Sequence, residues 1–229
     1  MLIRTTSQAV QSHPTYSQPR KPVVALAAEA RGAIEMMGVL MPFARNCEIY
    51  GEGEPAEYLY QVVSGTVRTS KVLADGRRQI GAFYMPGDLF GLEVGSDHAF
   101  SAEPITDAKI LVVKRSSVLA MAKRDNAFAQ ELLSATHQEL HRVQEHVVLL
   151  IKSAQERLAG FLLEMMARCK SQQFVELPMS RQDIADYLGL TIETVSRTFT
   201  QLETSAVIAV PTARRIEIRN RSALNQMNS

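Results

Sequence analysis

A carboxylate and a guanidinium stand four residues apart near the C-terminal end of the chain, at Glu193 and Arg197. Side chains at this spacing share one edge of an α-helix. Arginine can donate two hydrogen bonds to guanine O6 and N7, and glutamate can accept one from cytosine N4, so the pair is able to read neighbouring base pairs. The same spacing suits a surface ion pair, worth roughly a few tenths of a kcal/mol. The surrounding residues favour base reading.

The segment SRQDIADYLGLTIETVSRTFTQLE has the caps and the break of two short helices joined by a sharp turn. Ser180 and Asp183 have the spacing of a reciprocal cap at the start of the first helix. Gly189 can take the left-handed conformation that ends it, Leu190 fills the corner, and Thr191 can cap the second helix. This pattern predicts a helix-turn-helix, a motif whose second helix enters the major groove of DNA.

The second helix is predicted to have two different faces. Val195, Phe199 and Leu202 recur at i, i+4 and i+7 and are expected to point inward. Beyond the helix, residues 207–218 alternate as two strands and predict a wing. Arg214 would lie at the edge of this wing, either against a DNA phosphate or as part of a solvated arginine pair. The solvent-facing side of the helix is expected to carry Ile192, Glu193, Ser196, Arg197 and Thr200.

The rest of the chain has to position this unit. Short β-branched and aromatic runs are separated by turn residues, of which Asp75-Gly76 is the clearest hairpin signal, and they predict an antiparallel barrel or roll. A helix closed by Pro42 is predicted at 24–41, and residues 1–23, rich in serine, glutamine and proline, predict a flexible arm. The predicted strands lie at 47–50, 58–63, 66–73, 79–84 and 109–113.

Residues 125–152 contain neither glycine nor proline and predict one long helix. A narrow apolar stripe with a heptad register suits pairing with the same helix of a second copy, although a helix packed on its own domain is the alternative. The predicted domains are therefore a β-roll over 24–124, a dimerisation helix over 125–152 and a DNA-binding domain over 153–229. The stripe consists of Leu133, Leu140, Val143, Val147 and Leu150.

Composition excludes several classes of protein. Of 229 residues, 46% are hydrophobic and 21% are charged, as in ordinary soluble proteins, and the net charge of +1 gives no bulk argument for nucleic acid. No apolar run reaches the roughly 18 residues of a membrane span and no signal peptide is present, so a cytoplasmic protein is expected.

Cys47 and Cys169 are too few for a disulfide framework, and Cys169 is expected in the core. Missing catalytic motifs argue against an enzyme.

Two stretches of the sequence resemble the CRP/FNR family of bacterial transcription regulators, and within it the FNR/FixK branch. They are LPMSRQDIADYLGLTIETVSRTFTQLE at 177–203 and VSGTVRTSKVLADGRRQIGAFYMPGDLFG at 63–91. The resemblance implies an α+β fold. Its parts are an N-terminal antiparallel β-roll like a cyclic-nucleotide-binding domain, a long dimerisation helix and a C-terminal winged helix-turn-helix.

The resemblance also implies roles for individual residues. Ile192 stands where the CRP branch has a base-reading arginine, which favours TTGAT-like half-sites, and two copies of the recognition helix require that these half-sites form a palindromic operator. A homodimer on double-stranded DNA is implied, and in this branch it activates low-oxygen, respiratory or nitrogen-fixation-type genes through RNA polymerase. Glu193, Ser196 and Arg197 match the base-reading residues of the family, and Arg181, Thr191 and Thr194 fall where the family contacts DNA phosphates.

The predicted β-roll departs from the ligand-binding members of the family. Gly87-Asp88-Leu89 resembles the start of the cyclic-nucleotide cassette, but Phe100 stands where the phosphate-neutralising arginine belongs, so cyclic AMP binding is not expected. Residues 1–46 contain no cysteine, which leaves too few ligands for an iron-sulfur cluster of the FNR type. No cofactor is predicted. The alternative is an effector-dependent regulator whose roll binds an unidentified small molecule, or haem through His98 or Cys47.

Two histidines on the long helix, His137 and His141, have the spacing of a helical metal pair. No carboxylate or thiolate clearly converges on them in the sequence pattern. We therefore expect a solvated helix face and no metal site.

Overall fold

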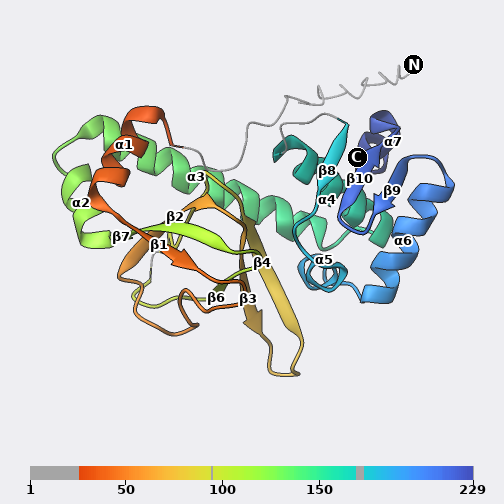
Figure 1. The fold of residues 1–229 in the computed structure, drawn as a ribbon, viewed down its shortest axis with the longest axis horizontal. Helices are drawn as coiled ribbons and strands as arrows, with labels where there is room; N and C mark the ends of the chain where they lie inside the picture. The colour runs from red at the N-terminus through yellow and green to blue at the C-terminus, as the bar shows by residue number, and fades with distance from the viewer. Residues whose placement is uncertain (1–25, 94, 169–172, 229) are drawn as a thin grey trace, which may run out of the picture.

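The computed structural model describes residues 26–228 except 94 and 169–172. In this part of the chain the fold is α+β. A β-roll is followed by a long central helix and then by a helical unit with a small sheet (Figure 1). The predicted arm at 1–23 and the predicted core position of Cys169 lie outside the described residues. No helix in the described part of the chain is long and apolar enough to cross a membrane.

Two antiparallel sheets form the β-roll. Tyr50, Tyr60, Tyr84 and Phe90 pack between them, with ring centroids 5.0–6.2 Å apart. The hairpin predicted at Asp75-Gly76 joins two of the strands. One sheet has the order β1 (Val39–Phe43), β7 (Ala108–Lys114), β2 (Tyr58–Ser64) and β5 (Leu89–Phe90), and the other has the order β4 (Arg78–Tyr84), β3 (Val67–Val72) and β6 (Ser101–Pro104).

The N-terminal part of the roll differs from the sequence prediction. Helix α1 (Ala28–Met37) ends before Gly38, and the residues after it form β1, so the predicted helix at 24–41 is too long. A side chain at Gly38 would meet Leu111 and Val113 at less than 3 Å, which shows how closely the chain approaches β7 there. Pro42 is tolerated in β1 because this strand lies at the sheet edge and has one neighbour. The predicted strand at 47–50 is reduced to a single bridge at Tyr50.

Helix α3 (Asn126–Leu149) is the long helix that the sequence predicts, and the side chain of Asp125 caps its first turn by accepting from the Phe128 amide at 3.0 Å. Its side towards the roll carries the buried residues Phe128, Ala135 and Arg142. A short helix, α2 (Arg115–Ala122), precedes it and was not predicted. At about 1.5 Å per residue, α3 is roughly 36 Å long and connects the two halves of the molecule.

The C-terminal unit contains the predicted helix-turn-helix and wing. Helix α4 (Ala154–Arg168) starts with the predicted reciprocal cap, in which the Ser153 amide donates to Glu156 Oε2 at 2.7 Å. A final helix, α7 (Arg221–Met227), was not predicted. The helix-turn-helix is α5 (Arg181–Leu188) and α6 (Ile192–Thr204), and the small sheet has the order β8 (Phe174–Glu176), β10 (Arg215–Ile218) and β9 (Ile208–Thr212).

The roll and the C-terminal unit share one hydrophobic core. Ile80 and Phe83 of β4 lie in the same buried cluster as Phe161 of α4 and Tyr187 of α5. The ring centroids of Phe83 and Tyr187 are 5.2 Å apart. The first helix of the helix-turn-helix therefore packs directly on the roll.

Candidate nucleic-acid interface

The helix-turn-helix forms through the local caps that its sequence predicts. Ser180 Oγ accepts from the Asp183 amide at 3.0 Å, and Asp183 Oδ2 accepts from the Ser180 amide at 3.0 Å, which confirms the reciprocal cap. Gly189 has φ 62° and ends α5. The Thr194 amide then donates to Thr191 Oγ1 at 3.2 Å and starts α6. The start of α5, its end and the start of α6 are thus each determined by residues within one helical turn.

Helix α6 separates apolar from polar residues as predicted. Val195, Phe199 and Leu202 are buried, whereas the side that faces away from the core is exposed to solvent. In Figure 1 this helix lies at the outer end of the molecule, opposite the roll. The exposed residues of its first two turns include Ile192, Glu193, Ser196 and Arg197.

The carboxylate of Glu193 accepts hydrogen bonds at the start of α6. Its pKa lies below the ordinary value, first because its own backbone amide donates to it, then because of the Thr191 hydroxyl, and least because of the charge of Arg197. An anion at the first turn also interacts favourably with the helix dipole. Both Glu193 and Arg197 are exposed at the surface of α6.

The residues expected at DNA phosphates lie in different environments. The Arg181 guanidinium lies 3.4 Å above the Phe199 ring, and burial lowers its pKa to about 10, so it remains charged at neutral pH. Thr191 and Thr194 lie together at the start of α6, with their hydroxyl oxygens 3.1 Å apart. Arg214 is exposed in the turn between β9 and β10, on a different element.

The apolar stripe of α3 is largely uncovered. The exposed fractions of Leu133, Leu140, Val143 and Val147 lie between 44% and 58%. Leu150 is half-buried, and it lies near Gly189 at the corner of the helix-turn-helix. Since other residues of α3 pack on the roll, the helix has one side buried in its own chain and one apolar side open.

The remnant of the cyclic-nucleotide cassette is part of the packing of the chain. Asp88 accepts from the Met85 amide at 2.7 Å and pairs with Arg168 of α4. Burial raises the pKa of Asp88 to about 6 in spite of the opposing charge of Arg168. Phe100, where an arginine would be needed, lies against the backbone of Gly81. Sequence reasoning missed the tie between Asp88 and Arg168, because nothing local couples residues 80 positions apart.

The two candidate haem ligands lie in unlike places. His98 is buried inside the roll, where its ring stacks on Tyr50 with centroids 3.6 Å apart and its Nδ1 lies 3.3 Å from Glu93 Oε1. Cys47 is exposed on the surface. The imidazole is therefore already surrounded by side chains of its own chain.

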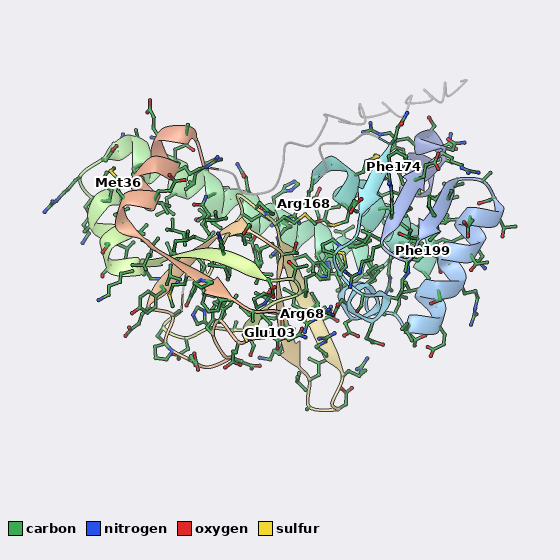
Figure 2. The ribbon with its side chains drawn as sticks, viewed as in Figure 1. Met36, Arg68, Glu103, Arg168, Phe174 and Phe199 are labelled. Carbon is green, nitrogen blue, oxygen red and sulfur yellow. The ribbon has the colours of Figure 1, made fainter. Side chains whose placement is uncertain are left out.

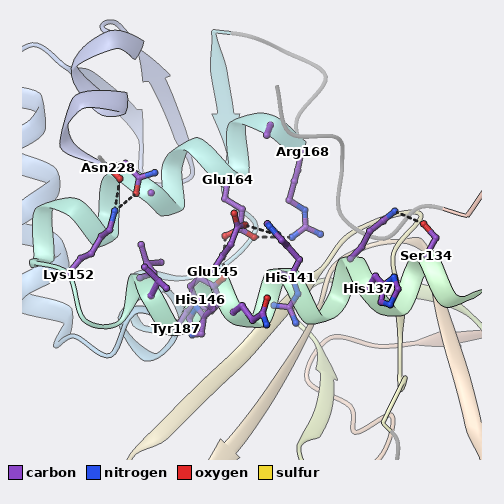
Figure 3. Close-up of a pocket in the computed structure, with 17 residues that line it drawn as sticks. Ser134, His137, His141, Glu145, His146, Lys152, Glu164, Arg168, Tyr187 and Asn228 are labelled. Atoms are coloured by element: carbon purple, nitrogen blue, oxygen red, sulfur yellow. Dashed lines mark hydrogen bonds and ion pairs between the residues drawn. The ribbon is translucent and has the colours of Figure 1, made fainter. Parts of the chain in front are cut away.

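A pocket of about 740 Å³ lies between α3 and α4, with Tyr187 of α5 and Asn228, just after α7, in its wall (Figure 3). Many of the polar groups in its wall contact one another. Tyr187 Oη donates to Glu164 Oε2 at 3.2 Å, and Lys152 donates to the backbone oxygen of Asn228. The His146 ring lies 4.2 Å from the Tyr187 ring, and burial, with a smaller contribution from Arg142, lowers its pKa to about 4.

The histidine pair of α3 lies at the rim of this pocket. His137 and His141 are exposed, and His141 Nδ1 is 3.7 Å from Glu145. Among the described residues, no group of three or more histidines, cysteines and carboxylates is arranged to hold a metal ion.

Comparison with known proteins agrees with the geometry. Residues 156–227 match the Crp-like helix-turn-helix domain, and residues 40–125 match the cyclic nucleotide-binding domain. The nitrogen fixation regulation protein FixK of Azorhizobium caulinodans is 48% identical over 202 residues, which are 86% of this chain and 82% of that protein. The chain belongs to the CRP/FNR family. This confirms the predicted family and the predicted combination of β-roll and helix-turn-helix.

Other CRP/FNR relatives place the chain in the FixK-like branch. FixK of Rhizobium meliloti is 42% identical over 79% of this chain and 82% of its own length. The solved structure of FixK2 from Bradyrhizobium japonicum is 49% identical, with a TM-score of 0.80 over 84% of this chain and 98% of that chain. The protein is thus a transcription regulator with a DNA-binding helix-turn-helix.

Proposed function

We propose that this regulator binds DNA as a homodimer and reads a palindromic operator with TTGAT-like half-sites. The observation that carries this proposal is the exposed face of α6, where Glu193, Ser196 and Arg197 lie together on a helix capped by Thr191. Arg197 and Glu193 would contact the G·C pair of each half-site. Arg181, Thr191, Thr194 and Arg214 would hold the phosphate backbone on either side.

Dimerisation is proposed through the open apolar stripe of α3. Four exposed leucine and valine side chains at heptad spacing are costly in water and are covered when two such helices pair. The pairing would place two recognition helices about one turn of DNA apart. In this arrangement residues 24–124 form the roll domain, 125–152 the dimerisation helix and 153–229 the DNA-binding domain.

The regulated genes are proposed from the named relatives. Two are nitrogen fixation regulation proteins, and a third, the transcriptional activatory protein AadR of Rhodopseudomonas palustris, is 39% identical over 71% of this chain and 70% of its own length. We therefore propose an activator of nitrogen-fixation, respiratory or low-oxygen genes that contacts RNA polymerase. We propose no catalytic role for this regulator.

The roll is proposed to act without cyclic nucleotide or iron-sulfur cluster. Phe100 supplies no charge for a cyclic phosphate, and aromatic rings pack between the sheets. Under the alternative, an effector-dependent regulator, a small molecule or haem would raise DNA affinity. Calorimetric titration with cyclic AMP, cyclic GMP and haem separates the two, because only the alternative expects saturable binding coupled to a gain in DNA affinity.

Selection of bound DNA from a random pool tests the proposed function directly. We expect a palindrome with TTGAT-like halves, bound roughly 10³-fold or more tightly than random DNA. Selected sequences without a palindrome would contradict the dimer, and a palindrome of another sequence would contradict the assigned half-site.

A further inference from the structure

Two arginines of the β3–β4 hairpin, Arg68 and Arg78, bind the first helix of the helix-turn-helix from the side of the roll. Figure 2 labels Arg68 at this position. Arg78 Nε donates to Asp186 Oδ2 at 2.7 Å, and its Nη2 lies 2.7 Å from Asp183 Oδ1. Arg68 Nη1 lies 2.8 Å from the same oxygen of Asp183, and its Nη2 lies 2.6 Å from Glu103 of β6. We call Arg68, Arg78, Asp183 and Asp186 the roll–α5 ion cluster.

The ion cluster is largely removed from water. The exposed fraction of the side chain is 11% for Arg68, 7% for Asp183 and 12% for Asp186, and Arg78 is more exposed at 28%. Burial alone would raise the pKa of Asp183, but hydrogen bonds from Ser180 and the charges of Arg68 and Arg78 bring it below the ordinary value. The pair therefore stays ionised, and removing one partner would leave a charge buried without compensation.

Asp183 links this cluster to the backbone of the motif. Its Oδ1 accepts from both arginines, while its Oδ2 accepts from the Ser180 amide and hydroxyl at 3.0 and 2.7 Å. The cap that starts α5 is therefore attached to the roll. The hairpin is thus attached to the first turn of α5 through Asp183 and to a later turn through Asp186.

A second contact holds the other end of α5. Gln79, next to Arg78 on β4, donates to the Tyr187 backbone oxygen at 3.3 Å. The Tyr187 ring is buried against Phe83 of the roll and His146 of α3. The direction of α5 is thus defined relative to both the roll and α3, the helix that carries the open apolar stripe.

We propose that Arg68 and Arg78 are positioning residues for DNA recognition, which set the separation and angle of the two recognition helices by orienting α5 on α3. This inference rests on the proposed dimeric function. A helix-turn-helix dimer reads half-sites about 34–36 Å apart. One base pair more or less in the spacer moves a half-site by about 3.4 Å and turns it by about 35°. A rigidly held motif discriminates strongly against such a shift, and a loosened motif discriminates weakly.

The test uses the full-length protein and the palindrome obtained by selection. Binding is measured to this operator, to versions with one base pair added to or removed from the spacer, and to a duplex with a single half-site. The variants are Arg78→Glu, the pair Arg78→Glu with Asp186→Arg, and Arg77→Glu. Arg77 is the matched control, because it lies beside Arg78, has a side chain 77% exposed, and pairs with Asp75 of its own turn. It reproduces the change in net charge without touching α5.

We expect Arg78→Glu to bind the native operator about tenfold or more weakly than Arg77→Glu does, as part of the gain from simultaneous engagement is lost. Its preference for the native spacer should fall, while base preference on the single half-site stays unchanged. The pair of substitutions should restore part of the spacer preference, because it re-forms the ion pair with position 186 but leaves the new carboxylate facing Asp183. Circular dichroism and thermal melting confirm that each variant is folded.

Two results would overturn the inference alone. One is a spacer preference in Arg78→Glu equal to that of Arg77→Glu. The other is an equal loss on all operators that Asp186→Arg does not restore even in part, because a merely structural role predicts this pattern. Wild-type protein without a preferred sequence would instead overturn the proposed function, and the inference with it.

Discussion

The two helices of the helix-turn-helix differ in what surrounds their charged side chains. On α5, Asp183 and Asp186 are engaged by arginines of the roll, and Tyr187 is buried in the shared core. On α6, Glu193 and Arg197 face solvent. The acidic side chains of α5 are therefore bound by other parts of the chain, whereas the charged pair of α6 is open to solvent.

The same division runs along α3. Ala135 and Arg142 are buried against the roll, whereas Leu140 and Val147 are exposed. We call a side of a helix held when it packs against the rest of the chain, and open when it is exposed to solvent. Substitutions on a held side should change the stability of the chain, and substitutions on an open side should change what the chain binds.

Replacing Leu140 and Val147 together with glutamate should separate the proposed dimer while each chain stays folded, because four like charges would face one another across the stripe. Operator binding should fall by roughly 10²- to 10⁴-fold, the usual gain from two linked reading heads. Sedimentation measures the first effect and a binding titration the second. A dimer that is unchanged in this variant would show that the two chains do not pair through the apolar stripe of α3.

On the held side, Tyr187→Ala should lower the free energy of unfolding by about 3–5 kcal/mol, as expected for deleting a buried aromatic ring. Tyr187→Phe should lose only about 1 kcal/mol, because it removes the hydrogen bond to Glu164 and keeps the ring. Thr200→Ala on the open side of α6 serves as the control, within about 0.5 kcal/mol of wild type. Urea denaturation measures all three.

On the open side, Arg197→Ala should weaken specific binding by about 1–3 kcal/mol per half-site and relax discrimination at the G·C pair, with little change in stability. The measurement is a titration on matched and mismatched operators. If base preference is unchanged and only the salt dependence falls, this side of α6 contacts the backbone and specificity lies elsewhere.

The held side of α3 should respond to pH. The folded-state pKa of His146, about 4, lies below its ordinary value of 6.5, so folding favours the neutral imidazole. This contribution is fully present above pH 6.5 and is lost as the pH falls towards 4. Between pH 7 and 5, wild type should lose about 1–2 kcal/mol more than His146→Phe. Urea denaturation at the two pH values compares them, and parallel losses would show that the imidazole is not held neutral.

The smallest effect is expected at the wing. Arg214→Ala should weaken binding to all sequences about equally and reduce the slope of log affinity against log salt by roughly one, because a phosphate contact carries no base information. The opposite signatures of Arg214 and Arg197 appear in one salt-titrated series. An unchanged salt slope would favour a solvated side chain at Arg214.

Elements with local signals were predicted well. Ser180, Gly189 and Thr191 determine where α5 and α6 begin and end, since a cap or a left-handed glycine acts within one turn. The uninterrupted run at 125–152 likewise predicted α3 to within three residues at its C-terminal end. The end of α1 was predicted wrongly because Gly38 packs closely on β7 and the residues after it pair with that strand. This contact joins residues far apart in the chain, so the local sequence does not predict it.

The sequence by itself determined the kind of motif, its cap residues and the solvent-exposed side of α6, because helix periodicity alone separates the two sides. Only the tertiary structure decided what holds the motif in place. Arg68 and Arg78 meet Asp183 across 115 and 105 residues of chain, and His98 is buried against Tyr50. Such partners are chosen by how sheets and helices pack, and burial then makes each pairing hard to replace.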